Sequence, residues 1–192
     1  MHGHKIINQN KLHFITCTVV GWLDVFTRSK YKDIIIDSLN YCIKNKGLVL
    51  NAYVIMSNHI HIIGYAKSGY QLSDILRDFK TFTSKQIINS ILEDTGESRQ
   101  EWMLRLFKYF AKYNSNNTTY QFWKNDNKPI ELESPKWISH RVNYVHNNPI
   151  NAGIVKLAEH YIYSSAINYV EGKGLIEVEL IDLGFTEGYV PS

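Results

Sequence analysis

The stretch that most constrains the fold is residues 51–64, which read NAYVIMSNHIHIIG. Two runs rich in β-branched and aromatic residues are separated by a Ser-Asn pair, so the stretch predicts two strands joined by a short turn. Side chains alternate between the two faces of a strand, and His59 and His61 therefore project from the same face. Neutral imidazole is a common metal ligand, so this pair is a candidate metal site.

A second interpretation of the histidine pair stays open. His59 and His61 can simply be two polar side chains on a solvated strand face, because two histidines alone do not complete a metal site. The outcome depends on what other segments bring to that face.

The remaining elements follow in a recognisable order. Strand, helix, strand, strand and helix predict an α+β domain, and a ferredoxin-like antiparallel sheet with helices packed on one face is the natural architecture. Trp123 and Trp137 are expected in the core. The expected strands are 12–20, 48–56 and 59–65, and the expected helices are 29–45, one that follows Gly69, 101–113 and 134–148.

The helix 134–148 has the clearest boundaries. Ser134 is a candidate N-cap with proline at the next position, and Pro149 is expected to end the helix. Residues four apart share a helix face, which places Arg141, Tyr144 and Asn148 in one row. A phenol can act as a nucleophile, and an amide oxygen can bind a metal ion. The simpler alternative for Tyr144 is a surface tyrosine with its hydroxyl in water.

Two blocks of sequence carry a family resemblance. YVIMSNHIHII at 53–63 and YVHNNPINAGIV at 144–155 resemble the signature blocks of the single-tyrosine HUH transposases, which include small insertion-sequence transposases and REP-associated tyrosine transposases. Shorter stretches at 14–18, 121–123 and 163–166 are also similar to conserved segments of that family. Ser57 stands where the family usually has proline.

The resemblance implies specific roles. Tyr144 would be the catalytic nucleophile, and His59, His61 and Asn148 would bind Mg²⁺ or Mn²⁺. The implied reaction cleaves and rejoins single-stranded, hairpin-flanked DNA through a 5′-phosphotyrosine. The implied fold is the ferredoxin-like sheet with an additional C-terminal helix that bears the tyrosine.

DNA contacts and assembly are further expectations. Residues expected to contact DNA phosphates are Arg77, Lys80, Lys85 and Arg141, although a solvated helix face explains the same lysines. The partner would be single-stranded or hairpin DNA, and a homodimer is compatible with the family. A catalytically silent, domesticated protein that only binds DNA hairpins is the main alternative, and an unrelated hydrolase that uses the histidine pair is another.

Composition sets the broader limits. One domain over 1–192 is expected, with a core at about 12–170, a helical insert at about 93–117 and an acidic tail at about 170–192. Residues 157–192 carry a net charge of −5 and the rest +8, which is compatible with a polyanionic partner. No apolar run approaches the ~20 residues of a membrane span, and two cysteines predict no disulfide framework. The low cysteine count favours a reduced cytoplasm, and the family resemblance implies a DNA-associated protein of a bacterial cell.

Overall fold

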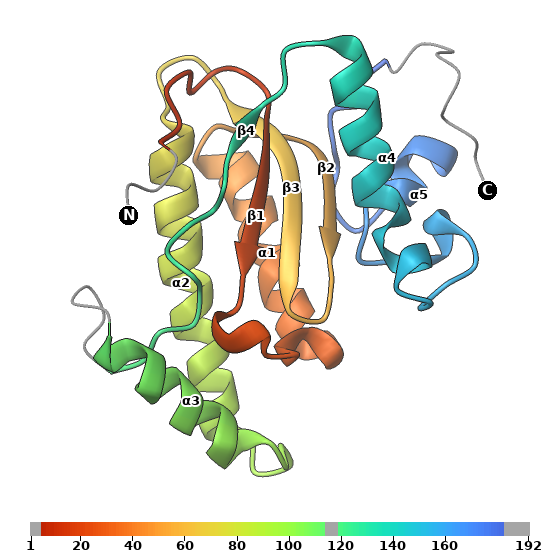
Figure 1. Ribbon diagram of the computed structural model, residues 1–192. Helices are drawn as coiled ribbons and strands as arrows, with labels where there is room; N and C mark the ends of the chain where they lie inside the picture. Colours follow the sequence, from red (N-terminus) through yellow and green to blue (C-terminus); the bar gives the residue numbers. More distant parts are fainter. Residues whose placement is uncertain (1–4, 114–118, 183–192) are drawn as a thin grey trace.

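The computed structural model describes residues 5–113 and 119–182 (Figure 1). Short 3₁₀ turns, η1 (Val20–Trp22), η2 (Val25–Thr27) and η3 (Ala158–His160), connect some of the longer elements. The strands are β1 (His13–Thr18), β2 (Leu48–Ile55), β3 (His59–Ala66) and β4 (Ile130–Glu131). The helices are α1 (Ser29–Asn45), α2 (Leu72–Glu93), α3 (Gln100–Lys112), α4 (Pro135–Asn151) and α5 (Ala166–Glu171).

The four strands form one antiparallel sheet in the order β2-β3-β1-β4. This confirms the predicted α+β, ferredoxin-like sheet. α1 and α2 lie on one side of the sheet, and α4 lies on the other, against β2 and β3 (Figure 1). In the pairing of β1 with β3, Thr16 lies opposite His61 and Thr18 opposite His59. Opposed residues share a face, so both threonines belong to the histidine face.

The opposite face of β1 and β3 forms the main core. Ile15, Ile60 and Ile62 are almost completely buried, as expected for residues that alternate with the two histidines. Phe79 of α2 and Leu39 of α1 belong to the same buried cluster. Full burial of such side chains contributes about 1.5–3 kcal/mol each. This packing fixes β3, and thereby the direction in which its histidines project.

Helix α4 begins as predicted and ends later. The Ser134 hydroxyl accepts a hydrogen bond from the backbone N–H of Trp137 at 3.3 Å, with proline at the first helical position. The predicted end before Pro149 is wrong, because α4 continues to Asn151. Proline removes only its own bond to the carbonyl four residues earlier. The next turn still forms, since the N–H of Ala152 donates to the carbonyl of Asn148.

The two tryptophans expected in the core have different outcomes. Trp123 is 5% exposed and donates from its indole N–H to the Thr83 hydroxyl at 3.0 Å. Trp137 is 53% exposed, so that expectation is wrong. It lies in the first turn of α4, ahead of the buried residues Ser139, Val142 and Val145.

Three remaining points concern strand β4, the limits of the domain and membrane spans. The two-residue strand β4, which pairs with β1, had no sequence signal of its own. Parts of the predicted helical insert and acidic tail, 114–118 and 183–192, lie outside the described residues, and the domain limits stay predictions. In the part of the chain that is described, no helix is long and apolar enough to cross a membrane.

Candidate active site

The histidine pair lies at the start of β3, beneath α4. The ring centroids of His59 and His61 are 4.7 Å apart, and the His61 side chain is largely enclosed. Phe14 of β1 stacks on the His61 ring at 5.0 Å. The strand alternation expected from the sequence therefore holds, and the shared face is covered rather than freely solvated.

Hydrogen bonds to Nδ1 orient both imidazoles. The Asn58 Oδ1 atom lies 2.8 Å from His59 Nδ1, and a carbonyl oxygen can only accept, so His59 Nδ1 carries the proton. The Asn58 amide is oriented in turn, because its Nδ2 donates to Asp24 Oδ1 at 2.9 Å. The Thr16 hydroxyl lies 2.9 Å from His61 Nδ1. In neutral rings of this tautomer, Nε2 presents a lone pair, as a metal ligand requires.

Two buried histidine nitrogens, His61 Nε2 and His146 Nδ1, lack a hydrogen-bond partner among the described residues. Of these two nitrogens, only His61 Nε2 belongs to a ring that lies beside a second histidine and an exposed tyrosine, where a metal ion could supply its partner. Burial, the neighbouring His59 and the Arg141 guanidinium lower the pKa of His61 to about 3, and burial also lowers the pKa of His59. Both rings are therefore neutral near pH 7, the form that binds metal ions.

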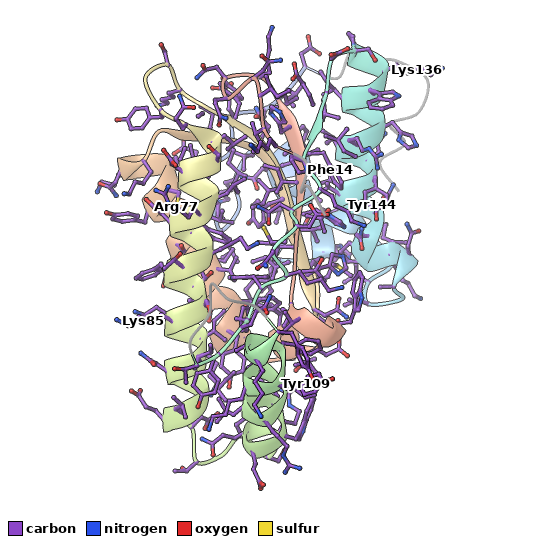
Figure 2. The ribbon with its side chains drawn as sticks, turned by 60° about the vertical axis from the view of Figure 1, so that its left-hand side comes forward. Phe14, Arg77, Lys85, Tyr109, Lys136 and Tyr144 are labelled. Carbon is purple, nitrogen blue, oxygen red and sulfur yellow. The ribbon has the colours of Figure 1, made fainter. Side chains whose placement is uncertain are left out.

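Tyr144 projects from α4 onto this face. Its ring centroid lies 5.3 Å from that of His61 and 5.9 Å from that of Phe14, and the side chain is 39% exposed. The Arg141 guanidinium lies over both aromatic rings, 5.0 Å from Phe14 and 5.8 Å from Tyr144. A phenol with a cation beside it and open to solvent on one side is accessible to a polyanionic substrate. Figure 2 shows Phe14 and Tyr144 close together on the α4 side.

Asn148 lies one helical turn beyond Tyr144 and is half-buried. β3 and α4 run in opposite directions in Figure 1. Four helical residues advance about 6 Å, and two strand residues about 6.6 Å. Because Tyr144 is level with His61, Asn148 lies near the level of His59.

His59, His61 and Asn148 offer suitable donor atoms for a hard divalent ion but no negative charge. Two neutral imidazoles and an amide oxygen can bind Mg²⁺ or Mn²⁺, but they bring no negative charge. Within 5–113 and 119–182, no cluster of three or more His, Cys, Asp or Glu residues could hold a metal ion. The donor set is therefore suited to an ion that is also bound by a substrate phosphate.

Comparison with known proteins identifies the family. A family model described as "Transposase IS200 like" matches residues 7–125. The chain belongs to the IS200-like transposase family. Members of this family are DNA-cleaving enzymes. The matched region contains His59 and His61 and ends before Tyr144 and Asn148.

One solved structure shows a similar fold, and a second is a weaker match. A REP-associated tyrosine transposase bound to a REP hairpin is 15% identical, with a TM-score of 0.62, and the match covers 97% of this chain and 95% of that one. A putative transposase from Deinococcus radiodurans R1 is 14% identical, with a TM-score of 0.41, covering 77% of this chain and 96% of that one. No curated protein matches the chain.

The residues expected to contact DNA fall into two groups in this IS200-like transposase. Arg141 lies beside Tyr144, whereas Arg77, Lys80 and Lys85 line a groove of about 780 Å³ along α2. Figure 2 shows Arg77 and Lys85 on the side of the molecule away from Tyr144. The Lys80 ammonium donates to the Lys124 carbonyl at 2.6 Å, and Arg77 pairs with two aspartates. Only Arg141 is therefore positioned beside the candidate site.

The sequence did not predict the residues that orient the two histidines. Thr16, Asp24 and Asn58 have no distinguishing local pattern, and Asp24 is 34 positions from the asparagine it binds. The signal available was the strand pairing of 12–20 with 59–65, which brings Thr16 opposite His61. Sequence alone did not specify that register.

Proposed function

We propose that this IS200-like transposase cleaves and rejoins single-stranded, hairpin-flanked DNA through a covalent 5′-phosphotyrosine at Tyr144. The observation that carries the proposal is the Tyr144 ring beside His61, whose buried Nε2 lacks a partner. Family membership and a similar fold bound to a REP hairpin support DNA as the partner.

The proposed step is a transesterification. The Tyr144 oxygen attacks the scissile phosphorus and loses its proton to solvent. The bond to the 3′ oxygen breaks, and that oxygen leaves as a 3′-hydroxyl after taking up a proton. A 3′-hydroxyl attacks the phosphotyrosine in the reverse direction and rejoins DNA, so the phosphodiester energy is kept and no nucleotide cofactor is needed.

Neighbouring residues assist this step. The Arg141 guanidinium, 5.8 Å from the Tyr144 ring, attracts the phosphate to the attacking oxygen. His59, His61 and Asn148 would hold Mg²⁺ or Mn²⁺, which when bound polarises the phosphate and offsets transition-state charge. Because these three ligands are neutral, DNA and metal should strengthen each other's binding.

The same geometry bears on whether one chain suffices for the proposed site. Tyr144 lies over His61 of its own chain, so one chain holds both parts of the proposed site. A homodimer that exchanges α4 is compatible with the family but is not required. The proposal places the protein with DNA in the bacterial cytoplasm.

The test is capture of the covalent intermediate. Labelled single-stranded hairpin DNA from sequence flanking the gene is incubated with protein in Mn²⁺ or in chelator, and adducts that survive denaturant are counted. We expect an adduct with wild type in Mn²⁺ and none with Tyr144→Phe. Tyr41→Phe, which removes the hydroxyl of an exposed tyrosine on α1, should behave as wild type. Tight binding without an adduct in any metal would instead support the silent hairpin-binding protein.

A further inference from the structure

A second exposed aromatic side chain lies at the edge of the candidate site. Trp22, in the turn after β1, is 57% exposed. Its ring centroid lies 6.2 Å from that of His59, with the two planes nearly perpendicular. A large aromatic ring is therefore exposed to solvent directly beside a proposed metal ligand.

The backbone holds Trp22 outward in an unfavourable conformation. Its φ is +57°, in the left-handed region that side chains other than glycine rarely adopt. Val20 and Leu23 on either side are buried, so the turn is anchored in the core. Gly21 fits closely against α3, because a Cβ there would lie 2.9 Å from the Phe110 ring. Strain of this kind persists where surrounding structure enforces it, often at ligand sites.

A cation accompanies the indole. The Lys124 ammonium lies 4.2 Å from the Trp22 ring centroid, a cation–π distance. Backbone pairing fixes its position, since the Lys124 N–H donates to the Thr18 carbonyl at 2.8 Å. The residue before it, Trp123, forms a bridge with Val19. The turn therefore presents a flat ring and a positive charge together, beside His59.

We propose that Trp22 is a stacking platform for an unpaired nucleobase adjacent to the scissile phosphate, with Lys124 contacting the DNA backbone. This inference rests on the proposed function, because it takes the site at His59 to be where the phosphate binds. Exposed aromatics with nearby cations bind single-stranded nucleic acid in this way, and every base offers a π-face. A packing role does not explain a strained, solvent-facing indole.

The first measurement is affinity for DNA that is not cut. A fluorescein-labelled hairpin flanked on both sides by unpaired thymidines is titrated, by anisotropy, with protein carrying Tyr144→Phe. Adding Trp22→Ala should weaken binding by about 5- to 150-fold, the range for loss of one base stack. Trp22→Phe should retain most of the affinity. Trp102→Ala, at an exposed tryptophan of α3, is the matched control and should leave affinity unchanged.

A second measurement separates stacking from a structural effect. Each unpaired thymidine is replaced in turn by an abasic site. At one position the replacement should weaken binding by the Tyr144→Phe protein and should weaken it no further once Trp22→Ala is present. All variants should have the same melting temperature as the parent protein. Trp22→Gly should have an equal or higher melting temperature, because glycine tolerates the positive φ.

The outcomes distinguish this inference from the proposed function. The role of Trp22 is overturned if the Trp22→Ala and parent proteins bind DNA equally well. It is also overturned if, at every position, the abasic site weakens binding by the same factor with and without Trp22→Ala. Either result holds even if wild type forms an adduct. If Trp22→Ala loses affinity but wild type forms no adduct, the stacking role of Trp22 is supported and the proposed cleavage is not. Absence of any binding to single-stranded DNA overturns both.

Discussion

Replacing Thr16 by valine tests how the protein prepares His61 for a metal ion. The Thr16 hydroxyl is 2.9 Å from His61 Nδ1, and the ring is buried. If Nδ1 carries the proton, the hydroxyl is its acceptor. Valine has nearly the same shape and no acceptor, so this tautomer would retain a buried, unpaired N–H.

The structure sets the expected magnitude. An unpaired buried nitrogen costs about 1–3 kcal/mol. The hydroxyl can accept from Nδ1–H or donate to an unprotonated Nδ1, so valine imposes this cost on both neutral tautomers and leaves the ring without its orienting partner. A ring that the hydroxyl no longer orients binds a metal ion less well, so affinity for Mn²⁺ should fall about 10- to 100-fold, typical for loss of an orienting group.

Two assays measure these effects. Nitrogen–proton NMR correlation of the imidazoles reports the His61 tautomer, and an electron paramagnetic resonance titration reports free Mn²⁺. Thr18→Val is the matched control, because Thr18 lies on the same face of β1, opposite His59. It should leave the His61 tautomer unchanged. Unaltered Mn²⁺ affinity in Thr16→Val would refute the reasoning.

Two further predictions concern α4. Asn148→Ala should weaken Mn²⁺ binding several-fold without unfolding the protein. Asn147→Ala, at the exposed neighbouring position, should leave Mn²⁺ binding unchanged. Equal effects of the two substitutions in the same titration would show that Asn148 is not a metal ligand. Burial lowers the pKa of His146 to about 4, from 6.5 in the unfolded chain. The unfolded state therefore binds the extra proton as pH falls from about 6.5 towards 4, and stability falls with it. Between pH 7 and 5 the free energy of unfolding should drop by about 2 kcal/mol more in wild type than in His146→Gln, measured by urea unfolding.

The sheet was predictable because its signals are local. Alternating apolar residues and the break at Ser57 and Asn58 define β2 and β3, and the Ser134–Pro135 pair defines the start of α4. The later end of α4 was not predictable from Pro149 alone, since packing and the next turn's hydrogen bonds outweigh one missing N–H.

The candidate site was predictable only in part. Periodicity placed His59 and His61 on one face, and the family resemblance suggested Tyr144 before any contact was known. The groups that orient the histidines depend on strand register and on a loop contact between Asp24 and Asn58, which a local pattern does not encode. Trp22 was not identified either, because its exposure results from a strained turn rather than from its neighbours in sequence.

The central claim is that Tyr144 becomes covalently attached to DNA. Wild-type protein is reacted with hairpin DNA and Mn²⁺, the adduct is trimmed with nuclease and protease, and tandem mass spectrometry locates the modified residue. The account predicts a nucleotide joined through its 5′ phosphate to Tyr144. A nucleotide on any other residue, or cleaved DNA with unmodified Tyr144 throughout the time course, would contradict it.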